Sequence, residues 1–204
     1  MSLFIIKLEE AKRDLGIEDC EEDAAIEAWL EGLQGRIESH LDRALLRSEN
    51  ETVYADGGER TIYLRRWPVE ELSVREDADK IFGDDTLLVE NIDYHLSERR
   101  GRLRRVGADW VDGDEVVRIV STAGYQACGA EEIDGREPMP EAIRRAALMQ
   151  FGFEWRNRDK LGITQFDAKG HGASFSNPVD LARRQMTLLP EVETTLEPFR
   201  RILL

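Results

Sequence analysis

The stretch "PMPEAIRRAALMQFGFEWRNRD", Pro138 to Asp159, decides the fold, because it predicts a long helix that is apolar around much of its circumference. Pro140 stands near the first helical position, where a missing backbone N–H costs nothing. We expect a helix over 139–159. A helix of this kind is buried on more than one side, so we interpret it as a central core helix, the alternative being a helix that binds a partner in a groove. Its apolar face is formed by Ile143, Ala147, Phe151 and Trp155, widened by Ala146, Leu148 and Met149.

Two more helices are predicted upstream, over 6–16 and 21–46. The second begins with acidic residues and ends with basic ones, which matches the helix dipole. Its apolar positions recur at spacings of three and four: Ile26, Leu30, Leu33, Ile37, Leu41 and Leu45.

Residues 51–125 change period and predict short strands separated by turns. Asp56-Gly57-Gly58 between two β-rich runs predicts a hairpin, since a primed turn needs positive φ. The most strand-like run is Val116 to Val120. The order of helices, strands and helices indicates an α+β fold, in which a pair of N-terminal helices and the long later helix pack with an inserted antiparallel sheet.

We expect one domain over 1–160, followed by a mobile loop over 161–178, where glycines interrupt any apolar period. Residues 179–204 are expected to form a short helix from Pro190 that stops at or before Pro198, and then a basic and apolar tail.

The composition restricts the class of protein. With 28 basic and 42 acidic residues the net charge is −14, which argues against a protein that grips duplex DNA. Cys20 and Cys128 form no C-x-x-C pair and suggest no disulfide framework, so a reducing compartment is expected. The apolar run Leu3–Ile6 is too short for a signal peptide or a membrane span, so we expect a soluble protein that is intracellular when made.

Signals for an enzyme are poor. The three histidines, His40, His95 and His171, fall in three different kinds of predicted element, and the sequence has no P-loop, G-x-S-x-G or H-E-x-x-H. Asp112-Gly113-Asp114, like the Asp56 turn, lacks the later glutamate of a calcium loop and is interpreted as a turn. The sequence therefore predicts no catalytic residue, no metal site and no cofactor.

One segment departs from the acidic character of the chain. "ERRGRLRR", residues 98–105, holds five arginines and one glutamate, and Gly101 predicts a hairpin tip within it. The segment is either a solvated turn or a contact to an acidic protein, such as a neighbouring copy of this chain; a contact to DNA is less favoured. The candidate protein-interface residues are Arg99, Arg100, Arg102, Arg156, Arg158, Phe199, Arg200 and Arg201.

Several short motifs follow one another in a recognisable order over about residues 5–160. They are Leu8–Lys12 with Leu15, the helix within 19–45, Leu64–Val69 with Leu72–Val74, Asp93-Tyr94, Gly101–Leu103, Trp110, Ala123–Tyr125, Pro140–Leu148 and Trp155–Asp159. In this order the chain resembles the head–tail connector (adaptor) proteins of long-tailed bacteriophages and prophages. The order of the motifs, rather than any single one, carries the resemblance.

The resemblance implies a structural protein without catalysis. Its copies would form a ring beneath the portal, twelve-fold in the virion and either monomeric or oligomeric in isolation. The ring would extend the DNA channel and dock a stopper or tail-completion protein. DNA would pass without specific binding, and no membrane would be involved. The expected location is the virion neck, and the bacterial host cytoplasm during assembly. The alternatives are another phage neck or tail-completion protein or, less favoured, an unrecognised enzyme or regulator.

Overall fold

The computed structural model describes residues 4–128, 136–158 and 187–201, and the backbone of 165–168 and 171–174. The chain forms two compact units. The helical unit is Met1–Leu41 with Pro140–Arg200, and the sheet unit is Asp42–Met139 with Arg201–Leu204. The predicted α+β class is confirmed, with two N-terminal helices, a long later helix and antiparallel sheets of short strands.

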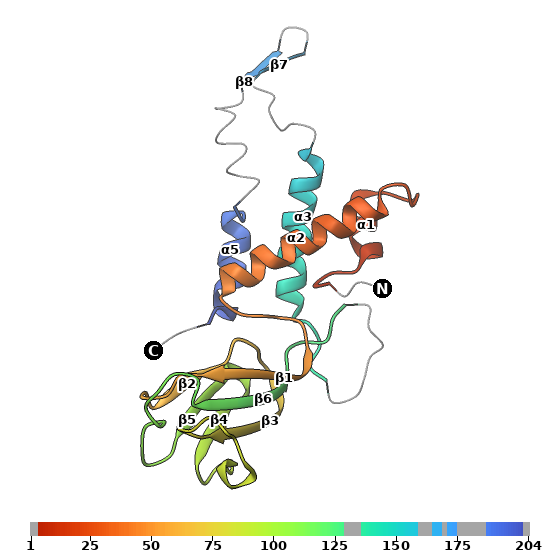
Figure 1. Ribbon diagram of the computed structural model, residues 1–204. Coiled ribbons are helices and arrows are strands. Elements are labelled where there is room, and N and C mark those ends of the chain that lie inside the picture. The colour runs from red at the N-terminus through yellow and green to blue at the C-terminus, as the bar shows by residue number, and fades with distance from the viewer. Residues whose placement is uncertain (1–3, 129–135, 159–164, 169–170, 175–186, 202–204) are drawn as a thin grey trace. The chain divides into compact units, whose positions relative to one another are not determined.

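The helical unit is built around α3, which packs against α1, α2 and α5 (Figure 1). The elements are α1 (Leu8–Leu15), α2 (Asp23–Leu41), α3 (Glu141–Arg156), α5 (Pro190–Leu196) and the 3₁₀ turn η4 (Glu197–Phe199). Ile143, Ala147, Phe151 and Trp155 of α3 are all buried, as are the predicted apolar positions of α2 up to Leu41. This is the packing expected of a core helix.

Two details of the helices differ from the prediction. Met149, assigned to the buried face of α3, is 53% exposed. The second helix ends at Leu41 rather than near residue 46, because Asp42 takes a left-handed φ of 50°. Ala44 and Leu46 then form backbone bridges within the sheet unit instead of a last helical turn.

A buried polar group lies inside the helical unit, where the sequence pattern suggests only apolar contacts. The Glu154 side chain is 1% exposed. Its carboxylate accepts hydrogen bonds from Trp29 Nε1 at 2.6 Å, from Arg36 Nη2 at 2.6–2.7 Å and from Gln150 Nε2 at 2.6 Å. Gln150 Oε1 in turn accepts the backbone N–H of Leu189 at 2.8 Å. This network joins α2 and α3 to the start of α5.

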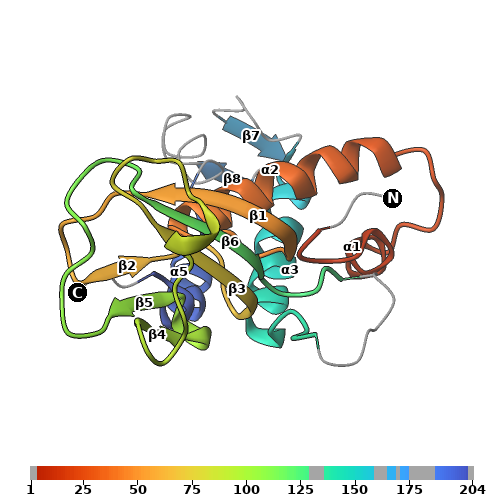
Figure 2. The ribbon, with the colours of Figure 1, turned by 60° about the horizontal axis from the view of Figure 1, so that its bottom comes forward.

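The sheet unit consists of two three-stranded antiparallel sheets, in the orders β1-β6-β3 and β2-β5-β4 (Figure 2). One apolar core, with Val74, Leu103, Trp110 and Ile119 among its members, takes residues from both sheets. The elements are β1 (Ser48–Ala55), β2 (Thr61–Tyr63), β3 (Val69–Glu76), η1 (Asp84–Thr86), β4 (Tyr94–Ser97), η2 (Glu98–Arg100), β5 (Arg102–Arg105) and β6 (Val117–Ala123).

The predicted hairpin around Asp56-Gly57-Gly58 is wrong. β1 pairs with β6, and β2 pairs with β5, so the two runs belong to different sheets. The turn between them is held by distant backbone, since Gly57 N donates to Gly113 O at 2.9 Å and Gly58 N to Trp110 O at 3.0 Å. A Cβ on Gly57 would lie 1.7 Å from Val111 O, so the close approach explains the glycine better than a primed turn does.

Two short strands fall within the range predicted to be a mobile loop, 161–178. β7 (Gln165–Ala168) and β8 (His171–Ser174) pair antiparallel. The other residues of the predicted loop lie outside the described part of the chain. In the part that is described, no helix is long and apolar enough to cross a membrane.

Trp155 provides a test of the helical core. Its ring packs against Phe151 at 5.6 Å and meets the edge of Trp29 at 5.7 Å. Trp155→Ala should lower the free energy of unfolding by about 3–5 kcal/mol, because the surrounding side chains cannot fill the space. Met149→Ala is the matched control on the exposed face of the same helix and should change it by less than about 0.5 kcal/mol. Chemical denaturation of both variants measures this, and equal effects would contradict the described packing.

Candidate subunit interface

The arginine-rich segment folds into the predicted hairpin, which is confirmed. β4 and β5 pair antiparallel, with Ser97 opposite Arg102, and η2 with Gly101 connects them. We call Arg99, Arg100 and Arg102 the arginine tip. Arg99 and Arg100 are exposed and Arg102 is half-buried. The Arg99 side chain is 88% exposed and lies 3.8 Å from Glu137, an ion pair too open to stabilise the fold by much.

The arginine tip is held by the residues beneath it. Gly101 has φ of 56°, and a Cβ there would lie 3.0 Å from the Trp67 ring. The guanidinium of Arg43 stacks on the Trp67 ring, 3.6 Å from the ring centroid. Arg43 also donates a hydrogen bond to the Trp67 carbonyl. Arg43 is 1% exposed and also faces the Tyr125 ring. This cation–π stack gives the tip a fixed base, and no sequence pattern predicts it.

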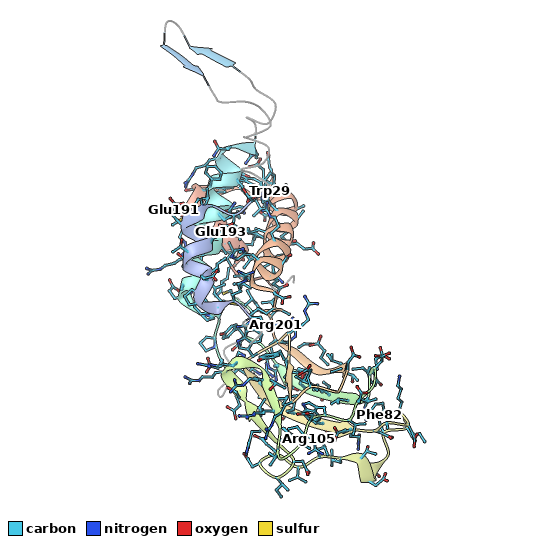
Figure 3. The ribbon with its side chains drawn as sticks, turned by 90° about the vertical axis from the view of Figure 1, so that its left-hand side faces the viewer. Trp29, Phe82, Arg105, Glu191, Glu193 and Arg201 are labelled. Carbon is cyan, nitrogen blue, oxygen red and sulfur yellow. The ribbon has the colours of Figure 1, made fainter. Side chains whose placement is uncertain are left out.

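Arg105, grouped with the arginine tip by its sequence position, lies elsewhere. It ends β5, and its guanidinium contacts the Glu76 carboxylate at 2.9 Å and donates to the Asp93 carbonyl at 2.6 Å. The Arg105 side chain, which is labelled in Figure 3, also lies over the Trp110 ring. The other Glu76 oxygen accepts the Val111 backbone N–H at 2.7 Å. Arg105 and Glu76 therefore fasten two loops to strands β3 and β5.

These two loops, residues 77–93 and 106–116, form what we call the loop end of the sheet unit. They hold ten acidic residues and one lysine. Tyr94, which begins β4, follows the first loop, whereas Ser97, which ends β4, precedes the arginine tip. The acidic loop end and the arginine tip thus lie at opposite ends of one strand.

The start of the first loop is ordered by one carboxylate. Asp77 accepts the backbone N–H groups of Asp79, Ile81 and Phe82 at 2.8–3.0 Å. These bonds, the one from Phe82 most of all, lower the pKa of Asp77 below its ordinary value, because they favour the charged carboxylate. They also hold Lys80 and Phe82 at positive φ, which non-glycine residues rarely adopt.

The candidate residues at the end of α3 already have partners in the helical unit. Arg156 donates to the Asp14 carbonyl at 3.0 Å and to its carboxylate at 3.3 Å. Arg158 stacks on the Trp155 ring at 4.0 Å and binds the Glu22 carboxylate at 2.6 Å. These contacts close α1 and the start of α2 onto α3, so both residues have a role within the subunit.

The three candidates of the tail differ from one another. Phe199 is half-buried at the end of η4, and Arg200 is exposed, 3.8 Å from Glu197. Arg201 belongs to the sheet unit and binds the Asp42 carboxylate at 2.9 Å, with 16% of its side chain exposed. Arg200 and Arg201 therefore each pair with a carboxylate of their own unit.

The described residues include no group of three or more histidine, cysteine, aspartate or glutamate side chains placed to hold a metal ion. Asp56 and Asp112, the residues weighed for calcium, both lie in connections between strands. Asp56 accepts the backbone N–H of Glu115 at 2.8 Å.

Solved structures with a similar fold come from gene transfer agent (GTA) particles. A chain from the neck of an empty GTA particle, computed with C6 symmetry, is 16% identical with a TM-score of 0.57, over 98% of this chain and 91% of that chain. A chain from the virion of the native particle is 18% identical with a TM-score of 0.52, over 98% and 91% of the two chains. A chain from the native neck, computed with C12 symmetry, is 15% identical with a TM-score of 0.50, over 100% and 97%.

No protein-family model and no curated protein matches the sequence. At these identities the likeness shows a shared fold along the length of the chain.

Arg105→Met tests the fastening of the loop end. The variant leaves Glu76, with 7% of its side chain exposed, as a buried charge without its cation, and should lower the free energy of unfolding by about 3 kcal/mol. Arg104→Met, at the neighbouring exposed position, is the control and should have little effect. Urea denaturation followed by circular dichroism measures both. If Arg105→Met matches its control, the ion pair does not hold the loops.

The pKa of Asp77 gives a second test. A carboxyl whose folded pKa is lowered stabilises its loop above the ordinary pKa and loses that contribution as the pH falls through the lowered pKa. In an NMR titration the amide signals of Ile81 and Phe82 should therefore shift together with the Asp77 carboxyl, at a pH below the ordinary aspartate value. A titration at or above that value would show that the three backbone bonds do not form in solution.

Proposed function

We propose that this chain is a structural subunit of the neck of a phage or phage-like particle. In this proposal it acts as a head–tail connector (adaptor) whose copies form a ring beneath the portal. The ring extends the DNA channel and docks a stopper or the tail. The observation that carries the proposal is the fold, which is shared along nearly the whole chain with chains of GTA necks. The proposal assigns the chain no catalysis.

The symmetry of those particles supports a ring. The two necks were computed with C6 and C12 symmetry, and a cyclic assembly needs two different surfaces on each subunit that complement one another. The sheet unit offers such a pair, because its arginine tip and its acidic loop end carry opposite charges.

The net charge of the chain supports a position in the wall of a channel through which DNA passes. A net charge of −14 disfavours binding to phosphates, so a channel lined by this protein would let DNA pass without holding it. This fits a location in the virion neck, after assembly in the host cytoplasm.

A second candidate within the same class is a tail-completion protein. The fold alone does not separate the two roles, because both belong to the neck region. They differ in the partner that the ring contacts first, which is the portal for a connector and the tail for a tail-completion protein.

Mixing the purified full-length protein with portal rings from the same genome tests the proposal. A connector should sediment with the portal, and electron microscopy should show an added ring with the portal's symmetry at one end. Portal rings from an unrelated phage are the control and should stay bare. Binding to tails but not to portals would favour the tail-completion role, and binding to neither would contradict both.

A further inference from the structure

The loop end of the sheet unit exposes apolar side chains in a concentration found nowhere else among the described residues. The described residues include nine large apolar side chains that are exposed, and six of these nine belong to the loop end. Ile81 is the most exposed, at 80%. The six are Ile81, Leu87, Val89, Ile92, Val106 and Val111. Exposed apolar residues concentrated in two loops that bond to each other, among charged residues, indicate a surface for a protein partner.

This surface is fixed before any partner arrives. Asp77 holds the turn that carries Ile81, and the Asp93 carboxylate accepts the Val89 backbone N–H at 2.8 Å. The Asp93 carbonyl accepts the N–H of Val106 at 2.9 Å, which ties the two loops together. A surface held this firmly loses little conformational entropy when it binds.

The charge of the surface selects its partner. The same two loops hold ten acidic residues and one lysine beside the six apolar ones, so the partner must be basic and must also cover apolar area. Arginine meets both needs, because its methylene stem packs on apolar side chains while its guanidinium pairs with a carboxylate. The arginine tip of this chain has that chemistry, and Arg99 and Arg100 are exposed.

The arginine tip does not reach the loop end of its own subunit. The two lie at opposite ends of β4, roughly 10 Å apart along an extended strand of this length. Among the described residues, the ion pair of the tip is that of Arg99 with Glu137, which is not in the loop end. No described ion pair joins the two surfaces within one copy, which leaves both of them for a second copy.

We propose that the arginine tip of one copy docks on the loop end of the next copy. This inference rests on the proposed ring and names the two surfaces that build it. Because the two surfaces differ, the contact is head-to-tail, and its repetition closes into a ring when the rotation between neighbours divides a full turn evenly. The side chains that pair are Arg99 and Arg100 of one copy with exposed carboxylates such as Asp85 and Glu90 of its neighbour.

Paired charge reversals test the contact. The tip variant carries Arg99→Glu and Arg100→Glu, and the loop variant carries Asp85→Lys and Glu90→Lys. Each alone places like charges opposite each other, so assembly measured by sedimentation, with portal rings present if these are required, should fall at least tenfold. The melting temperature should stay nearly unchanged, because exposed charges contribute little to stability.

Mixing the two variants gives the sharper result. In a 1:1 mixture the glutamates of one variant's tip face the two lysines introduced into the loop end of the other, and the unreversed surfaces of both also match. The mixture should therefore assemble into alternating oligomers although neither variant assembles alone. A chain that carries all four substitutions should assemble as well. Assembly of the wild type and of the mixture should weaken as salt rises, since the charges are screened.

Glu191→Lys with Glu193→Lys is the matched control, because it makes the same charge change at two exposed residues of α5, in the helical unit (labelled in Figure 3). It should assemble like the wild type. The inference is overturned if the loop variant assembles like the wild type. If that variant also fails to bind tail components, the loop end serves a tail partner instead of a second copy. Lack of rescue in the mixture also overturns it. If the wild type assembles neither alone nor on portal rings, the proposed function itself is contradicted. Failure of the proposed function is thereby distinguished from failure of the proposed contact.

Discussion

The constraint on which the rest of the sheet unit depends is that opposite charges are kept at opposite ends of one strand. β4 is only four residues long, yet its two ends carry the arginine tip and the acidic loop end. The pairing of β4 with β5, the Trp67 and Arg43 stack beneath Gly101, and the Arg105–Glu76 ion pair all act to keep these ends in place. A more flexible unit would let the charges meet within one chain and would leave nothing to offer a neighbour.

The helical unit depends on a different kind of interaction, the buried carboxylate of Glu154. Such a group is costly unless it is paired and fully hydrogen-bonded, and here Arg36, Trp29 and Gln150 supply the donors. Because those donors come from α2 and α3, the helices can satisfy Glu154 in only one register. Apolar packing alone tolerates small shifts of one helix along another, so the network makes the arrangement of the helices specific.

Apolar spacing predicted the α+β class, the stripe of α2 and the buried face of α3, because helix burial repeats every three or four residues. It could not predict Glu154 or Arg43 as buried, since a charged residue in a sequence shows no sign of the partner that will neutralise it. The Asp56 turn was misread for a related reason, because its glycine is required by the backbone of residue 111 and not by the local turn. Of the candidate site, Gly101 correctly indicated the hairpin. The loop end was missed because its apolar residues are spread through two loops without a period.

The position of the sheet unit in the chain has a consequence for how such proteins diversify. The chain leaves the helices after Leu41 and returns to them at Pro140, and Arg201 binds Asp42 near the point of departure. The helical core is built from residues on both sides of this insertion, and Leu30 and Ile37 line one small cavity together with Ala147. Mutations in the inserted loops therefore leave the helical core intact. A lineage can exchange the residues that recognise its neighbours while it inherits the helical framework unchanged, and fold is then preserved long after sequence similarity has faded.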